Sequence, residues 1–128
     1  MGQQQLLLIV LGVIIVGIAV VVGINVFTAS SSQANRDATI SDLTNLASLA
    51  QQYYRKPTAL GGGGNTFTGW TVPASLDTTG NGTYAITVAA QTVTLVGTGN
   101  ENGNNGTSAV QATMVVGPDR ITSTTINN

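Results

Sequence analysis

The chain has 128 residues, room for one small domain and a helical extension, and only 7% of them are charged, with a net charge of -1. It contains neither histidine nor cysteine, which excludes disulfide bonds, thiolate nucleophiles, the usual zinc ligands and a Ser-His-Asp triad. It also lacks the basic patch that would bind nucleic acid through its phosphates. We therefore predict a protein that is not an enzyme and holds no cofactor, and the sequence gives no indication of nucleic-acid binding.

The first predicted element is an apolar helix. Residues 6–24 read LLLIVLGVIIVGIAVVVGI, without a charged or polar side chain. At about 1.5 Å per residue, a helix of this length spans roughly 28 Å, close to the hydrocarbon thickness of a bilayer. In lipid the segment must be helical, because no water is present to satisfy its backbone. A chain this short has too little material to surround such a helix, so we predict that residues 1–27 lie in a membrane or in a bundle of helices.

The charges that flank this helix predict processing of the chain. All four basic residues follow the apolar run, and the first of them is Arg36. Orientation in a membrane normally relies on an excess of basic residues on the cytoplasmic side. We therefore expect that a basic leader preceded the sequence and was removed, which makes Met1 the processed N-terminus, or Gln3 if the cut follows Gly2.

Residues 28–56 predict an amphipathic continuation of the same helix. Its apolar positions are spaced by 3, 4, 3 and 4 residues, which places them on one face, and three further apolar residues widen that stripe. Glycine and proline are absent from residues 24–56. We predict one continuous helix that ends near Tyr54, because Pro57 disfavours helical backbone angles in the residue before it. The stripe consists of Ile40, Leu43, Ala47, Ala50 and Tyr54, with Leu46, Leu49 and Tyr53 beside it.

The remainder predicts a small antiparallel sheet. Four consecutive glycines suggest a flexible linker over residues 57–65, and a β-rich head follows over residues 66–128. We predict strands at residues 66–72, 84–88, 93–95, 110–116 and 121–126, a tight turn at residues 89–91, and a polar exposed loop at residues 97–108. The fold class is α+β, with one long N-terminal helix, apolar and then amphipathic, packed on the sheet.

An apolar helix that runs into an amphipathic helix and then a small sheet resembles the type IV pilin family. The resemblance is strongest over residues 1–56 and covers architecture rather than sequence in the head. It implies a structural subunit of an extracellular pilus-like filament, or fimbrium, that polymerises with itself. It also implies residence in the cytoplasmic membrane before assembly, handling by the pilus assembly machinery, and cleavage and N-terminal methylation by a prepilin peptidase. The filament-core residues would be Leu6, Leu8, Val10, Gly12, Val16, Ala19 and Gly23.

The sequence departs from the family pattern at the position that registers neighbouring subunits. Most pilins carry glutamate at the fifth mature position, where this chain has Gln5, or Leu7 if the cut follows Gly2. An amide accepts a weaker hydrogen bond from an ammonium group than a carboxylate does. The proline common near position 22 is also absent, and Gly17 and Gly23 either permit local unwinding there or are small residues that allow close helix contact.

Several polar residues have two interpretations each. Arg36, Asp37 and Asp42 either form polar contacts between subunits or belong to a solvated helix face. Asn81 and Asn105 each begin an N-x-[ST] glycosylation acceptor, a pattern that also arises by chance in a sequence rich in Asn, Gly and Thr. The acidic residues of the head, Asp77, Glu101 and Asp119, are too scattered to predict a calcium site.

Two other functions fit the same elements. One is a type II secretion pseudopilin, which would form a short periplasmic filament. The other is a binding module anchored in the membrane by a single helix, which leaves the long amphipathic continuation unexplained. The role of a filament in adhesion, motility, DNA uptake or biofilm is not encoded in these motifs.

Overall fold

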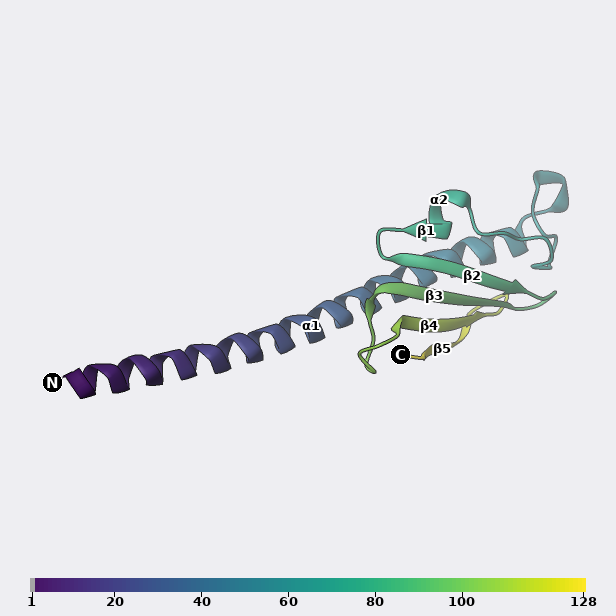
Figure 1. The fold of residues 1–128 in the computed structure, drawn as a ribbon. Helices are drawn as coiled ribbons and strands as arrows, with labels where there is room; N and C mark the ends of the chain where they lie inside the picture. The colour runs from purple at the N-terminus through teal and green to yellow at the C-terminus, as the bar shows by residue number, and fades with distance from the viewer. Residues whose placement is uncertain (1) are drawn as a thin grey trace. The chain divides into compact units, whose positions relative to one another are not determined.

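The computed structural model describes residues 2–128, so the processed N-terminus predicted at Met1 lies outside the described residues. The chain divides into two compact units, Met1–Ser31 and Ser32–Asn128, which we describe separately. The fold class is the predicted one, because the chain is α+β with one long N-terminal helix and a five-stranded antiparallel sheet (Figure 1). Helix α1 spans Gly2–Arg55 without interruption, which confirms the single helix expected from the sequence.

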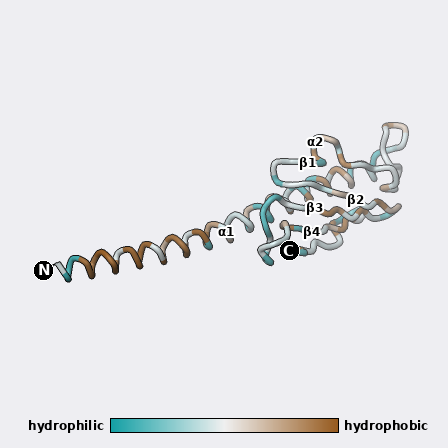
Figure 2. The backbone as a smooth tube through the Cα atoms, viewed as in Figure 1, coloured by the Kyte–Doolittle hydropathy of each residue, from teal (hydrophilic) through white to brown (hydrophobic). Residues whose placement is uncertain are grey.

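The first unit is helical over its described residues and is apolar throughout residues 6–24. Its hydrophobic residues follow one another along the N-terminal part of α1 (Figure 2). Gly17 and Gly23 both keep helical backbone, so the local unwinding considered for them is not observed. An added Cβ atom at Gly12, Gly17 or Gly23 would meet nothing within 4 Å, so none of these glycines is needed for packing inside the unit.

The second unit begins with the amphipathic part of α1, whose C-terminus is capped by the glycine-rich segment. The backbone N–H groups of Gly63, Gly64 and Asn65 donate to the carbonyl groups of Tyr53, Lys56 and Tyr54 at 2.8, 3.0 and 2.8 Å. These bonds satisfy carbonyl groups that the end of a helix leaves without partners. The sequence predicts a flexible linker over residues 57–65, whereas the structure folds this segment, with the 3₁₀ turn Thr58–Leu60, back onto the helix end.

Glycine is required in this cap by close approach of the backbone. A Cβ atom at Gly63 would lie 1.8 Å from the carbonyl oxygen of Thr66, and one at Gly62 would lie 2.3 Å from Lys56. Gly61 has a φ of 84° and Gly64 a φ of 59°, values in the left-handed region that residues with side chains rarely adopt. The four glycines therefore fit the chain reversal at the end of α1.

The sheet is a simple antiparallel meander (Figure 1). Its strands, in spatial and chain order, are β1 (Thr78–Thr79), β2 (Gly82–Val88), β3 (Val93–Asn102), β4 (Ala109–Val116) and β5 (Ile121–Ile126). Strands β2, β3, β4 and β5 confirm the four predicted strands that follow residue 80, and the turn between β2 and β3 is closed by a 2.8 Å bond from the Ala89 N–H to the Thr92 carbonyl. A two-residue strand and a single helical turn were not predicted from the sequence. The strand is β1, and the helical turn is α2 (Ala74–Asp77).

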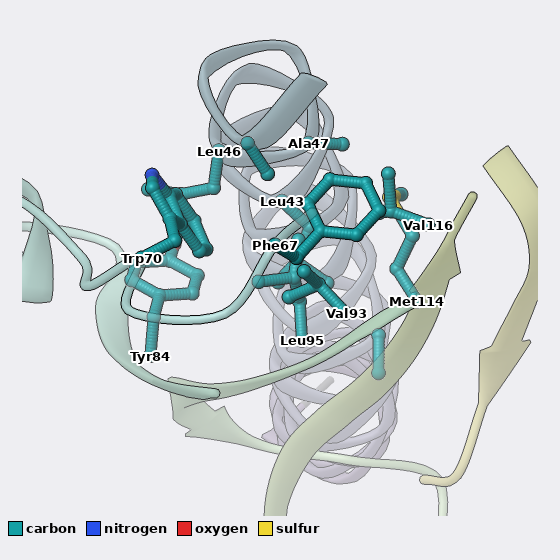
Figure 3. Packing of buried hydrophobic residues seen from close by; sticks show 12 residues of the cluster. Leu43, Leu46, Ala47, Phe67, Trp70, Tyr84, Val93, Leu95, Met114 and Val116 are labelled. Carbon is teal, nitrogen blue, oxygen red and sulfur yellow. The ribbon is translucent and has the colours of Figure 1, made fainter. Parts of the chain in front are cut away.

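The core lies between the amphipathic part of α1 and one face of the sheet (Figure 3). Every second residue of β4 is buried, and β3 alternates in the same way from Val93 to Gly99. Leu95 of β3 pairs with Ile86 of β2 and Met114 of β4, so these side chains share a face. The helix stripe predicted from the sequence supplies the other side of the core, where Leu43, Leu46, Ala47 and Ala50 are buried.

The strand predicted at residues 66–72 is wrong, because this segment forms a turn that inserts two aromatic side chains into the core. Phe67 and Trp70 are buried, and the Trp70 N–H donates to the Phe67 carbonyl at 3.0 Å. Gly69 has a φ of 90°, which is incompatible with extended strand backbone. Thr, Phe, Trp and Val favour strands because they suit a half-buried surface, and here a turn provides the same burial.

The exposed loop predicted at residues 97–108 is wrong in its first half, because β3 continues to Asn102. The reason is the close approach of α1 to this strand. A Cβ atom at Gly97 would lie 2.7 Å from Thr39 Cγ2, and one at Gly99 would lie 2.0 Å from Asn35 Oδ1. These glycines are therefore buried strand residues under the helix, although the same residue type usually indicates a turn.

Candidate functional site

The outstanding surface of the molecule is the apolar part of α1. Its 17 large hydrophobic side chains between residues 6 and 27 are each 50% to 75% exposed, on all sides of the helix. The most apolar window of α1 has none of its residues buried, and α1 is long and apolar enough to cross a membrane. A helix that is hydrophobic all round belongs in lipid or inside a larger assembly. The predicted filament-core residues Leu6, Leu8, Val10, Gly12, Val16, Ala19 and Gly23 are all among the exposed ones.

Small residues hollow this surface on one side. A shallow apolar groove runs along α1 between residues 15 and 30, with Ala19 and Gly23 among the residues that line it. Glycine inside a helix costs about 1 kcal/mol relative to alanine, and no contact within the unit compensates for Gly12, Gly17 or Gly23. Small residues of this kind let a second helix approach closely. Gln5, the predicted registration residue, lies exposed near the start of the same helix.

Arg36 is placed differently from the expectation of a contact between subunits or a solvated face. It is 7% exposed, and it donates hydrogen bonds to Asn104 Oδ1 at 2.8 Å and Gln33 Oε1 at 2.9 Å. Arg36 therefore joins α1 to the β3–β4 loop inside the head. Its buried Nε has no hydrogen-bond partner within residues 2–128. Asp37 remains exposed and accepts a 3.0 Å bond from Gln33.

Asp42 also serves the interior of the head, at the junction of α1 with β1 and β2. Its Oδ2 accepts hydrogen bonds from Tyr84 Oη at 2.5 Å, Thr79 Oγ1 at 3.0 Å and Asn81 Nδ2 at 3.0 Å. Hydrogen bonds to a charged group are among the stronger ones in proteins. The solvated face considered for Asp42 is therefore wrong, because its carboxylate orients the β1–β2 turn on the helix. A contact of Asp42 between subunits stays a prediction.

These contacts change the acidity of both partners. Burial pushes the pKa of Asp42 upward, but the hydrogen bonds from Tyr84, Asn81 and Thr79 outweigh it, so this pKa lies below its ordinary value of 3.8. Burial, and then the hydrogen bond to Asp42, raises the pKa of Tyr84 from 10.0 to about 12. Tyr84 therefore remains a protonated donor and Asp42 a charged acceptor throughout the neutral pH range.

We expect the head to lose stability at both ends of the pH scale through this pair. Asp42 has a lowered pKa in the folded state, so its contribution is complete well above 3.8 and is lost as the pH falls below that value. Tyr84 has a raised pKa, so its contribution is complete below pH 10.0 and is lost as the pH rises towards about 12. The measurement is denaturant unfolding of the full chain in detergent micelles, followed by the fluorescence of Trp70, which is the single tryptophan and is buried.

The Asp42→Asn variant provides the control for this pH dependence. At neutral pH it loses the charge on the acceptor, and a hydrogen bond to a charged group contributes about 1.5–3 kcal/mol. The difference in unfolding free energy between the variant and the original chain should shrink as acid protonates Asp42. A difference that stays constant from pH 7 to pH 2 would show that the carboxylate does not act through its charge.

Asn35 is a positioning residue that the sequence analysis missed. Its Oδ1 accepts from the backbone N–H groups of Asn100 at 3.1 Å and Glu101 at 3.2 Å, and its Nδ2 donates to the Asn81 carbonyl at 2.9 Å. One amide thus joins α1 to β3 and to the β1–β2 turn. The sequence contained one indication of this role. Asn35 and Thr39 are polar residues four positions apart, and they extend the buried face that continues with Leu43.

The remaining candidates are the acidic side chains, one ion pair and the two Asn-Gly-Thr acceptors. Within residues 2–128, no group of three or more His, Cys, Asp or Glu side chains is arranged to hold a metal ion. Arg55 and Asp119 approach to 3.9 Å with both side chains largely exposed, a pairing that contributes little in water. Asn81 lies between β1 and β2, and Asn105 lies between β3 and β4.

The chain was compared with protein families, curated proteins and solved structures. No family model, no curated protein and no solved structure matches the chain.

Proposed function

We propose that this chain is the structural subunit of an extracellular filament of the type IV pilus kind, held in the cytoplasmic membrane by α1 before assembly. The observation that carries the proposal is the exposure of all 17 large hydrophobic side chains between residues 6 and 27. Next to them in the chain, residues 32–128 form a unit with a complete core of their own. The apolar helix is therefore not needed to fold the head and is available for another role.

The free energy gained by burying apolar side chains favours placing this helix first in a membrane and then in a polymer. Full burial of a Val, Leu or Ile side chain contributes about 1.5–3 kcal/mol, and monomeric soluble proteins rarely leave a large continuous apolar surface in water. A bilayer covers such a helix in the membrane, and other copies of the same helix cover it in a polymer. Contacts that repeat head to tail between identical subunits generate an open helical filament when the rotation does not close.

The glycines favour the polymer over a solitary membrane anchor. An anchor requires only length and hydrophobicity, whereas Gly12, Gly17 and Gly23 weaken the helix without serving any contact inside the unit. In a bundle of helices, the groove that includes Ala19 and Gly23 can receive the side chains of a neighbouring copy. Prepilin peptidase and the assembly machinery are the partners that this proposal requires.

The test is the location and form of the native protein. We expect material sheared from the cell surface to contain this chain as the main component of filaments in electron micrographs, with a processed and methylated N-terminus by intact-mass analysis. Recovery in the membrane fraction alone, as monomers with an unprocessed N-terminus, would favour the anchored module. Recovery with the secretion apparatus, without surface filaments, would favour the pseudopilin.

A further inference from the structure

The two N-x-[ST] acceptors of the head have the same sequence, Asn-Gly-Thr, and opposite surroundings. They begin at Asn81 and Asn105. Transfer of a sugar requires that the side-chain amide nitrogen, Nδ2, be free of other partners and that the three residues be accessible to an enzyme. The structure therefore allows the two sites to be compared directly, with each serving as the control for the other.

The site at Asn81 is occupied by the fold. Its Nδ2 donates to Asp42 Oδ2 at 3.0 Å, and its carbonyl accepts from Asn35. The next residue, Gly82, is buried at the start of β2, where an added Cβ atom would lie 2.1 Å from the Thr98 carbonyl oxygen. A glycan on Asn81 would displace the bond to Asp42 and would have to leave a half-buried position.

At Asn105, the hydrogen bonds of the side-chain amide use its oxygen, Oδ1, and not its nitrogen, Nδ2. Its Oδ1 accepts from the backbone N–H groups of Thr107 at 3.0 Å and Ser108 at 2.9 Å, and from Asn128 Nδ2 at 3.2 Å. The first of these bonds is an Asx turn, which fixes the side chain by its oxygen alone. Within residues 2–128, Nδ2 of Asn105 donates no hydrogen bond, and the residue is exposed.

The residues that follow Asn105 are equally open. Gly106 has a φ of 71°, and an added Cβ atom there would meet nothing within 4 Å. Thr107 is exposed, and only its backbone N–H is used by the turn. A glycan on Nδ2 would leave every bond to Oδ1 in place, so modification would not cost the loop its structure.

We propose that Asn105 is an N-glycosylation site and that Asn81 is not. The co-reactant is a polyprenyl-phosphate-linked sugar presented by an oligosaccharyl transferase. Nδ2 of Asn105 bonds to the anomeric carbon of the sugar, the bond from that carbon to the phosphate oxygen breaks, and the polyprenyl phosphate leaves with the electron pair. Nδ2 keeps one of its two protons, and the other passes to the leaving polyprenyl phosphate, so that atoms and charge balance.

The experiment is peptide mapping of the native protein by mass spectrometry. Cleavage after Arg55, after Glu101, which is the single glutamate, and after Arg120 separates the two sites into peptides 56–101 and 102–120, because Pro57 blocks cleavage after Lys56. We expect peptide 102–120 to carry a glycan and peptide 56–101 to have its unmodified mass. The intact glycopeptide is the readout, since Asn-Gly sequences also deamidate spontaneously and give the same mass change as enzymatic removal of a glycan.

Matched variants remove the hydroxyl that the acceptor pattern requires and leave both asparagines in place. Thr107→Ala should abolish the added mass, and Thr83→Ala should leave it unchanged. An unmodified peptide 102–120 in native material overturns the proposal, and so does a glycan on peptide 56–101. A glycan on peptide 102–120 that persists in Thr107→Ala also overturns it, because the sugar would then be attached elsewhere. These readouts do not depend on whether the chain forms filaments.

Discussion

Val16→Asp is expected to abolish filament assembly while the head stays folded. Val16 lies near the middle of the apolar part of α1 and is 62% exposed in the single chain, so its side chain must be covered by lipid or by neighbouring helices. An aspartate at the centre of a membrane helix costs about 2.5–3.5 kcal/mol, which corresponds to about a 100-fold loss in insertion into the membrane, the step that precedes assembly in this proposal. Gly12→Arg should have the same effect. The measurement is electron microscopy of sheared surface material, with the variant traced by immunoblot.

Val16→Ile is the matched control, because it retains an apolar branched side chain of similar shape. Assembly of this variant should be close to that of the original chain. The emission of Trp70, buried in the head at 7% exposure, should be the same in all of these variants, since residue 16 and Trp70 belong to different units. Filaments formed by Val16→Asp in normal number would contradict burial of α1 in the filament core.

The helix and most strands could be predicted because each follows a local period. The spacing of Ile40, Leu43 and Ala47 identified the buried helix face, and Pro57 identified the end of the helix. Alternation along residues 110–116 identified β4 in the same way. Such patterns arise from one repeating environment, so a single sequence contains enough information to read them.

Elements that depend on partners far along the chain could not be predicted. Gly97 and Gly99 lie in β3 because α1 passes directly over them, and the sequence alone does not place Asn35 or Thr39 above that strand. The same reason explains why the contacts of Arg36 and Asp42 inside the head were not predicted, since their partners lie 68 and 42 positions away. Polar side chains in a helix show no period that distinguishes contacts within the head from contacts between subunits.

The apolar surface is the part of the candidate site that the sequence could predict. Its chemistry is uniform, so composition and length sufficed to identify residues 6–24 as a helix for an apolar environment. The difference between Asn81 and Asn105 could not be predicted from the sequence, because both acceptors read Asn-Gly-Thr. Only the partners of each side-chain amide separate them.

Phe67→Ala should destabilise the head by about 3–5 kcal/mol, the usual cost of removing a buried phenylalanine. Phe67 is fully buried, and its ring centroid lies 4.8 Å from that of Tyr54 in a tilted arrangement. The turn that contains it is joined to the sheet by a 3.0 Å bond from the Phe67 N–H to the Ala90 carbonyl. Because small domains are stable by only about 5–15 kcal/mol, this loss is a large share of the total. Denaturant unfolding followed by Trp70 fluorescence measures it.

Leu60→Ala provides the comparison, because Leu60 is a large hydrophobic residue of the neighbouring 3₁₀ turn that is 66% exposed. Its replacement should change the unfolding free energy by less than about 0.5 kcal/mol. Equal midpoints for the two variants would mean that residues 66–72 do not anchor the core. A selective loss in Phe67→Ala would show that residues 66–72 anchor the end of the core beside Tyr54 and Trp70.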